Sequence, residues 1–212
     1  MSPTRICSID PSAPEPALLE EAASSLWKGG LVVFPTETFY GLGANAIDRQ
    51  AVARVFRVKG RVESKPLLVL VDSVKMAESF ALEVSAAARR LMAAYWPGPL
   101  TLVFTAAPEL PVELTAGTGT VGMRMPGHSV ALGLVRAAGF PVTAPSANPS
   151  GEKPPTTAQA VQRFFEGKID LILDGGPTPG GRPSTVLDVS VSPPRLVRAG
   201  AIDISKFLTD AS

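Results

Sequence analysis

The sequence has very little of the chemistry that cysteine and histidine supply. It contains one cysteine, Cys7, and one histidine, His128, among its 212 residues. A single cysteine excludes a disulfide framework within the chain and any zinc site made from several cysteines. A single histidine excludes metal sites built from several histidines, and we assign His128 to the first turn of a helix, with no catalytic role. Any reaction that the chain catalyses must therefore use other groups.

The chain also lacks a strong excess of either charge, since its formal net charge is +1. Such a balance gives no general attraction to nucleic acids or membranes, so polyanion binding would depend on local clusters of lysine and arginine. The sequence does not open with a charged start that leads into an apolar signal segment, and no apolar run approaches the length of a membrane span. We therefore expect a soluble protein of a reducing, cytoplasmic compartment, without a membrane partner.

Hydrophobic residues are abundant, at 45% of the chain, and are sufficient for a substantial core. We expect helices over 17–28, 49–58, 73–80, 85–95, 128–138 and 157–166. We expect strands over 31–34, 67–71, 100–105, 120–125, 141–144, 170–174, 185–189 and 195–198. Because these segments interleave, the sequence predicts an α/β class with a mixed sheet. No repeat or long linker divides the chain, so we expect one domain over 1–212, with its core at about 17–208.

The N-terminal segment, residues 1–16, is rich in proline and serine. We interpret it as an N-terminal arm, which either forms an edge strand of the sheet or lies loosely on the domain.

The stretch 31–43 joins a predicted strand to a candidate ligand loop. The apolar run 31–34 is long enough for a buried strand and too short for a buried helix. Thr36 and Thr38 follow, and in an extended chain their hydroxyls would share one face while Glu37 would lie on the other. A strand that leads into a loop with hydroxyl groups and glycines is typical of a ligand site. A strand followed by an ordinary turn fits the same residues.

Three cations, Lys59, Arg61 and Lys65, follow the helix predicted over 49–58. Interaction with the helix dipole explains Lys59 but not the other two cations. The planar fork of Arg61 and the mobile charge of Lys65 suit a phosphate clamp. A solvated loop that happens to be basic is the alternative.

The segment 145–151 directly follows the predicted strand 141–144. Ser146 and Asn148 would share a face in an extended chain, and two prolines hold the segment rigid at little entropic cost. A ligand loop and a plain turn both fit this pattern.

The glycine-rich segment 174–185 lacks the Lys-Ser/Thr pair and the following helix of a P-loop, so a Walker nucleotide site does not fit it. Its main-chain N–H groups and the hydroxyl of Ser184 could line a pocket. Thr120, Arg124 and Arg198 are at or near the ends of predicted strands, where an inward cation is costly unless an anion meets it. A surface salt bridge is the alternative for each cation.

Several of these segments form a pattern when they are taken in order. Lys59-Gly60-Arg61 is a Lys-x-Arg motif and Ser146-Ala147-Asn148 is a Ser-x-Asn motif. Further motifs are PTETFYGLG at 35–43, PGPLT at 97–101, RMP at 124–126 and STVLD at 184–188. In this combination, over about residues 25–200, the sequence resembles the threonylcarbamoyl-AMP synthase family.

The resemblance implies an open, twisted α/β sheet, flanked by helices, with a large concave active-site cavity. It also implies that L-threonine, bicarbonate and ATP are converted to threonylcarbamoyl-AMP and pyrophosphate, for the threonylcarbamoyladenosine modification of tRNA. In this nucleotidyl transfer, threonine and bicarbonate form a carbamate whose oxygen attacks the α-phosphorus. Magnesium would be carried by the ATP phosphates, and no protein metal site is implied.

The resemblance also suggests roles for particular residues. Lys59, Arg61 and Lys65 would neutralise the triphosphate and the leaving pyrophosphate. Ser146, Asn148 and Thr120 would orient the nucleotide, and Arg198 would touch it. Among these residues, the expected catalytic set is Lys59, Arg61, Ser146 and Asn148. Arg124 would pair with the threonine carboxylate, Thr38 and Ser184 would contact other polar atoms of threonine, and the main chain of Ala144 would lie alongside.

Two departures from the family affect these expectations. Leu70 stands where some relatives have a histidine near the amino acid, so contacts to threonine could be fewer here. The chain also ends soon after the catalytic domain, at Ser212. We therefore expect a short form that closes its site with its own loops or with a partner protein of the tRNA-modifying machinery, and with weak or indirect contact to tRNA.

Two other functions remain open for the same fold. One is an RNA-binding module without enzymatic activity, against which the balanced charge and the absence of an aromatic and basic pattern count. The other is a carbamoyl-transfer domain of the hydrogenase-maturation or antibiotic-carbamoylation type. Such domains usually belong to larger multidomain chains.

Overall fold

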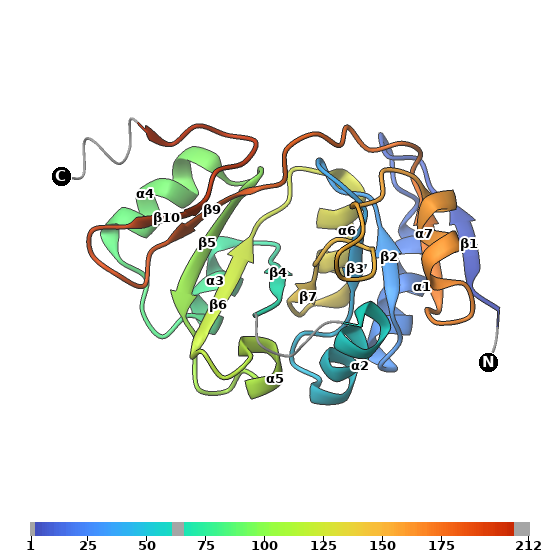
Figure 1. Cartoon of the computed structure of the whole chain (residues 1–212), viewed down its shortest axis with the longest axis horizontal. Helices are drawn as coiled ribbons and strands as arrows, with labels where there is room; N and C mark the ends of the chain where they lie inside the picture. Colours follow the sequence, from blue (N-terminus) through green and yellow to red (C-terminus); the bar gives the residue numbers. More distant parts are fainter. Residues whose placement is uncertain (1–2, 61–65, 206–212) are drawn as a thin grey trace.

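The computed structural model describes residues 3–60 and 66–205, in which helices and strands alternate (Figure 1). The helices are α1 (Pro16–Trp27), α2 (Arg49–Lys59), α3 (Val74–Phe80), α4 (Ala86–Tyr95), α5 (Val112–Thr115), α6 (Ser129–Ala138) and α7 (Ala158–Phe165). The strands are β1 (Arg5–Ser8), β2 (Val32–Phe34), β3 (Gly41–Gly43), β4 (Leu68–Leu70), β5 (Leu100–Thr105), β6 (Thr120–Arg124), β7 (Val142–Thr143), β8 (Leu171–Asp174), β9 (Thr185–Asp188) and β10 (Arg195–Arg198). This order confirms the predicted α/β class.

Within the described residues, the strands form two mixed sheets, with the orders β1-β8-β2-β3 and β10-β9-β5-β6-β4-β7. The pairs β1–β8, β2–β8, β4–β6 and β5–β9 are parallel, and the other pairs are antiparallel. The sheets meet at β3 and β7, where isolated bridges join Gly41 to Ser146 and Asn45 to Val142. The two sheets therefore approach the single open, mixed sheet that was expected.

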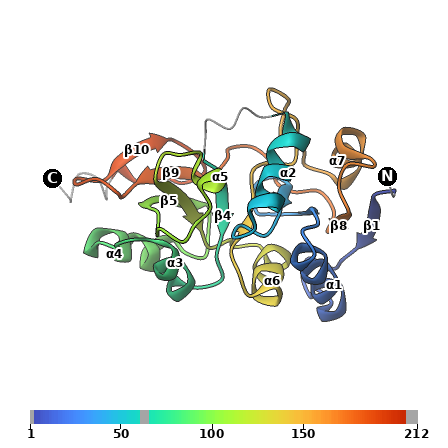
Figure 2. The ribbon, with the colours of Figure 1, turned by 90° about the horizontal axis from the view of Figure 1, so that it is seen from below.

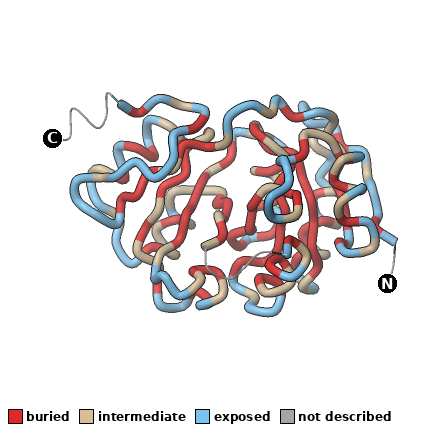
Figure 3. The backbone as a smooth tube through the Cα atoms, viewed as in Figure 1, coloured by how far each residue is buried: buried red, intermediate tan, exposed pale blue. Residues whose placement is uncertain are grey.

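The first sheet is covered by helices on both faces, as the alternation of its side chains requires. Val33 and Ile172 belong to the core cluster that contains the buried residues of α2 and α7. Val32 and Phe34 belong to the other cluster, which contains the buried residues of α1 and α6. Figure 2 shows α4, α3, α6 and α1 in a row along one side of the strands. Buried residues therefore follow the strands and the inner sides of the helices (Figure 3).

The second sheet uses its two faces differently. Leu102 of β5 and Met123 of β6 lie opposite each other and belong to the hydrophobic core. Thr101 and Arg124, their next neighbours along the same strands, line a cavity instead. Since side chains alternate along a strand, one face of this sheet closes the core and the other supplies a wall of the cavity.

Helix α2 begins and ends where its sequence predicts. The carboxylate of Asp48 accepts hydrogen bonds from the N–H groups of Gln50 at 2.8 Å and Ala51 at 3.3 Å. Such a cap satisfies N–H groups that have no partner within the helix. The helix stops at Gly60, whose φ of +57° is in the left-handed region that glycine adopts without steric cost. This stop places Lys59 at the cavity.

The residues Gly41–Gly43 form a strand, so the expectation of a loop there was wrong. Strand β3 pairs antiparallel with β2, with Gly43 opposite Val32 and Gly41 opposite Phe34. A Cβ on Gly43 would lie only 2.7 Å from Cε1 of Phe34. Glycine usually weakens a strand, but here the missing side chain leaves room for the Phe34 ring.

The N-terminal segment was left open between an edge strand and a loose arm, and the structure shows an edge strand. Strand β1 pairs parallel with β8, from Arg5 opposite Leu171 to Ser8 opposite Asp174. The short helix α5 was not predicted. In the part of the chain that the structure describes, no helix is both long and apolar enough to span a membrane.

Candidate functional site

A cavity of about 680 Å³ is lined by residues of both sheets. Its walls come from the turn before β3, the end of α2, strands β5, β6 and β10, and the loop after β7. A further wall comes from residues 175–184, which cross from β8 to β9 and which we call the strap. The polar residues of the lining are Thr36, Thr38, Tyr40, Lys59, Thr101, Thr120, Arg124, Ser146, Ser184 and Arg198.

Most of the site residues predicted from the sequence meet at this cavity. Those that line it are Thr38, Lys59, Thr120, Arg124, Ala144, Ser146, Ser184 and Arg198. Asn148 is buried and is not among the lining residues. Arg61 and Lys65 lie outside the described residues. Leu70 is fully buried beside Arg124 in the sheet and is absent from the lining.

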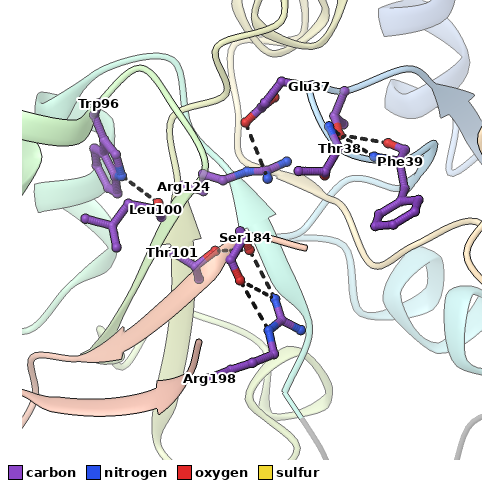
Figure 4. A network of polar contacts seen from close by, with 10 residues as sticks. Glu37, Thr38, Phe39, Trp96, Leu100, Thr101, Arg124, Ser184 and Arg198 are labelled. Carbon is purple, nitrogen blue, oxygen red and sulfur yellow. Dashed lines mark hydrogen bonds and ion pairs between the residues drawn. The ribbon is translucent and has the colours of Figure 1, made fainter. Parts of the chain in front are cut away.

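Arg124 is a buried cation at the end of β6. Its side chain is 3% exposed, and its Nη1 lies 3.4 Å from Oε1 of Glu37 (Figure 4). Burial lowers the pKa of Arg124, the charge of Glu37 opposes that shift, and the charge of Arg198 adds to it. An arginine nevertheless stays protonated in proteins, so this site holds a positive charge at low dielectric. Such a charge favours binding of an anionic group.

Ser184 is held between two neighbours on the cavity wall (Figure 4). Arg198 donates from Nη2 to the main-chain oxygen of Ser184 at 2.9 Å and to its Oγ at 3.1 Å. The hydroxyl of Thr101 lies 2.9 Å from the same Oγ. Burial lowers the pKa of Arg198. The contacts fix a serine hydroxyl and a second guanidinium beside each other at the cavity.

Thr38 is positioned by a tight turn rather than by an extended chain. The hydroxyl of Thr36 donates to the main-chain oxygen of Phe39 at 2.7 Å and lies 3.1 Å from the hydroxyl of Thr38. The N–H of Gly180 in the strap donates to the main-chain oxygen of Thr38 at 2.8 Å. The turn therefore contacts the Thr38 hydroxyl, and the strap holds the main chain of the same residue.

The strap has a second anchor in Tyr40. The Tyr40 hydroxyl donates to the main-chain oxygen of Gly176 at 2.7 Å, and burial raises the pKa of this phenol. Tyr40 is among the largest fully buried side chains of the protein. Its buried ring therefore fixes the position of the hydroxyl that holds the strap at Gly176.

Lys59 is bound to the loop that carries Ser146 and Asn148. Its Nζ donates to the main-chain oxygens of both residues at 2.6 Å. The side chain is 5% exposed. Because its donors meet carbonyl groups, Lys59 organises this loop in the structure, and its expected contact with phosphate remains a prediction.

Asn148 also organises this loop. Its Nδ2 donates to the main-chain oxygens of Pro149 at 2.9 Å and Glu152 at 2.7 Å. Its Oδ1 is buried and has no hydrogen-bond partner among the described residues. The side chain therefore has one unused acceptor, although it was expected to face a ligand directly.

Sequence reasoning gave no site role to Glu37 or Thr101, whereas Thr36, which it placed with Thr38 in a candidate ligand loop, does line the cavity. Glu37 was expected on the face opposite the two threonines, and it does lie outside the cavity lining that contains both of them. Thr101 is in the PGPLT motif, and its alternation with Leu100 and Leu102 could have identified it as a cavity residue. No sequence signal indicates that Glu37 meets Arg124.

Among the described residues, no cluster of three or more His, Cys, Asp and Glu side chains is arranged to hold a metal ion. The hydroxyl groups and cations of the cavity suit a ligand that carries anionic groups.

Comparison with known proteins identifies relatives of this arrangement. The threonylcarbamoyl-AMP synthase of Pyrococcus abyssi is 45% identical over 186 residues, which are 88% of this chain and 55% of the relative. A putative threonylcarbamoyl-AMP synthase of Mycobacterium tuberculosis is 39% identical over 88% of this chain and 85% of its own length. The chain thus spans about half the length of the Pyrococcus relative and most of the mycobacterial one.

A solved structure shares both the fold and the sequence. The crystal structure of P. abyssi Sua5 complexed with L-threonine has a TM-score of 0.93 and is 42% identical, over 97% of this chain and 60% of that one. The family model described as telomere recombination, which carries the names Sua5, YciO and YrdC, matches residues 24–200. With its cavity formed by the same segments that carry the match, this chain belongs to the Sua5, YciO and YrdC family.

Proposed function

We propose that this protein makes L-threonylcarbamoyl-AMP and pyrophosphate from L-threonine, bicarbonate and ATP. The relatives from Pyrococcus abyssi and Bacillus subtilis are named threonylcarbamoyl-AMP synthase, and this chain spans about half of each. The activity is therefore assigned from the relatives' names together with the cavity. The observation that carries it is the buried Arg124 beside the hydroxyls of a single cavity.

The proposed threonine subsite is at Arg124. A guanidinium binds a carboxylate through two parallel hydrogen bonds, and burial strengthens such a contact because water does not compete. Thr38 and Ser184 contribute hydroxyls to the same cavity, and Ala144 contributes its main chain. The solved P. abyssi Sua5 structure carries L-threonine, which supports an amino acid as the ligand.

The proposed nucleotide subsite uses Thr120, Ser146 and Arg198, which line the remaining wall. Lys59, Arg61 and Lys65 would carry positive charge to the triphosphate, and Asn148 would help to orient the nucleotide by holding the loop that carries Ser146. Magnesium would enter with the ATP phosphates. A cavity of about 680 Å³ is within the range of sites for small molecules of this size.

In the proposed reaction, the threonine amine attacks the carbon of bicarbonate, a C–O bond breaks and water leaves, which gives a carbamate. A carbamate oxygen then attacks the α-phosphorus of ATP. The bond from that phosphorus to the bridging oxygen of the β-phosphate breaks, and pyrophosphate leaves. The protein would contribute positioning, charge stabilisation and exclusion of water, so no nucleophilic side chain is required.

The proposed product serves the threonylcarbamoyladenosine modification of tRNA, which suits a cytoplasmic site of action. Transfer to tRNA would require partner proteins. Direct contact between this chain and tRNA would be weak.

The test measures pyrophosphate release from ATP with magnesium and bicarbonate, with and without L-threonine, and with L-serine as a control. Release that requires both threonine and bicarbonate is the expected result. Release with carbamoyl phosphate but not with threonine would indicate carbamoyl transfer. A salt-dependent shift of double-stranded RNA without any ATP turnover would indicate the binding module.

A further inference from the structure

The site contains a buried carboxylate for which the proposed reaction has no role. Both carboxylate oxygens of Glu37 are buried and make no hydrogen bond within the described residues, and neither does Nε of Arg124. The contact between them is an ion pair of 3.4 Å. Buried charges are normally both paired and hydrogen-bonded, since their desolvation is costly. This buried ion pair at a ligand cavity lacks the expected hydrogen bonds, and its presence there therefore needs an explanation.

The other ion pairs of the described residues differ from this one. In the pair of Arg49 with Glu113, the arginine side chain is 69% exposed, and in that of Arg195 with Asp188 it is 71% exposed. Such exposed pairs contribute little to stability because water screens them. Arg124 is 3% exposed in its pair, so Glu37 acts on it with far less screening.

Glu37 approaches Arg124 from outside the cavity. Arg124, Ser184 and Arg198 all line the cavity, whereas Glu37 does not. Figure 4 shows Glu37 on one side of the Arg124 side chain and Ser184 with Arg198 on the other. The carboxylate therefore faces the guanidinium without occupying the space in which a ligand would bind.

The charges around Arg124 make this placement useful. Arg198 is a second guanidinium at the cavity, and its charge acts against that of Arg124. Glu37 supplies one negative charge to this pair of cations. The three groups together keep one positive charge, which an anionic ligand in the cavity would neutralise.

We propose that Glu37 is a positioning residue, which holds the guanidinium of Arg124 so that one of its edges faces the carboxylate of an amino-acid substrate. The inference rests on the proposed function and deepens it. Glu37 touches no substrate in this arrangement. It fixes a cation before the substrate arrives, so that less ordering remains to be done on binding.

The experiment measures the binding of L-threonine and, separately, of ATP to the full chain by titration calorimetry, in the wild type, Glu37→Gln, Glu37→Asp and Glu83→Gln. Glu83 is exposed and is not among the residues that line the cavity, so its variant is the matched control. Glu37→Gln should weaken threonine binding about tenfold or more, which corresponds to the loss of one oriented ionic contact. ATP binding should change by less than about twofold. Glu37→Asp retains the charge and should restore part of the affinity.

A purely structural role of Glu37 would weaken both ligands together and would lower the thermal midpoint in parallel. That result would overturn the positioning role and leave the proposed function standing. The same conclusion would follow if Glu37→Gln bound threonine as tightly as the wild type does. If Glu37→Gln does not fold, Glu37→Asp decides, because threonine binding should fall while ATP binding stays. Failure of the wild type to bind threonine at all would instead overturn the proposed function, and this inference with it.

Discussion

The Nζ of Lys59 lies 2.6 Å from the main-chain oxygen of Ser146, which follows it by 87 residues. The contact joins the last residue of α2 to the loop after β7. It connects the two motifs, Lys-x-Arg and Ser-x-Asn, that are far apart in the sequence. One ammonium group thus brings the two motifs together in the fold.

Lys59→Met should destabilise the protein as well as reduce its activity. The substitution keeps most of the volume but removes the ammonium donor from the main-chain oxygens of Ser146 and Asn148, of which that of Ser146 keeps only the N–H of Asn148. We expect a loss of about 2–4 kcal/mol in the free energy of unfolding, measured by urea denaturation. Lys28→Met, at an exposed lysine, is the control and should change the free energy little. Equal stability of the two variants would show that Lys59 does not organise the loop.

Asn148→Ala should also lower stability. Its Nδ2 holds the main-chain oxygens of Pro149 and Glu152, and the substitution would leave both without that donor. A loss of about 1–3 kcal/mol is expected in urea denaturation. The sequence alone, which places Asn148 and Arg61 in the expected catalytic set, predicts instead that Asn148→Ala and Arg61→Ala both abolish synthesis at a nearly unchanged thermal midpoint. For Arg61→Ala that expectation stands, and a large loss of stability there would assign Arg61 to structure.

Gly43→Ala should disrupt the hairpin of β2 and β3. The added Cβ would lie 2.7 Å from the Phe34 ring and 2.9 Å from the main-chain oxygen of Val32. Such overpacking costs about 1–3 kcal/mol, which a shift of the urea midpoint would report. Gly127→Ala is the matched control, since its nearest contact, Cα of Gly98, is at 3.6 Å. The two variants should differ clearly in stability, and similar midpoints would contradict the packing argument.

Stability should fall as the pH decreases below about 6.5, because of His128. Its Nδ1 accepts a hydrogen bond from the N–H of Val130 and caps α6, so it must be unprotonated. Burial lowers its pKa below the ordinary value of 6.5, and the charge of Glu37 only partly opposes this shift. The unfolded chain therefore takes up a proton first, and the stabilisation that is complete above pH 6.5 is lost as the pH falls towards the folded-state pKa.

His128→Asn tests this pH dependence, since asparagine is a good helix cap that does not titrate. The urea midpoints of the wild type and the variant are compared from pH 7.5 down to about pH 5.5. The midpoint of the wild type should fall more steeply than that of the variant. Parallel curves would mean that other groups cause the acid sensitivity.

Most of the fold was predictable because local signals agree with the tertiary structure. The cap at Asp48 and the stop at Gly60 define α2, and short continuous apolar runs define strands of the core such as β2 and β4. Strand β3 could not be predicted, since its glycines normally indicate a turn. Their role depends on the ring of Phe34, which the pattern of the sequence does not place.

The candidate site was predictable to the extent that its residues belong to motifs. Thr38 is in the turn after β2, Arg124 ends β6 and Ser184 directly precedes β9, and all three line the cavity. The pairing of Glu37 with Arg124 depends on a turn that bends the chain after β2, and no spacing in the sequence encodes it. Likewise, no spacing in the sequence indicates that Lys59 donates to the main-chain oxygens of Ser146 and Asn148, and its expected contact with phosphate stays a prediction.

The strap also determines where this chain can be opened for engineering. Residues 181–182 are exposed, and exposure alone would select them for the insertion of a reporter domain. The strap is nevertheless bound to Thr38 through Gly180 and leads directly into Ser184, so an insertion there would displace two walls of the cavity. The exposed turn between β9 and β10, at residues 191–193, lies outside the cavity lining. New termini or a fused fluorophore at that turn would leave the ligand site intact.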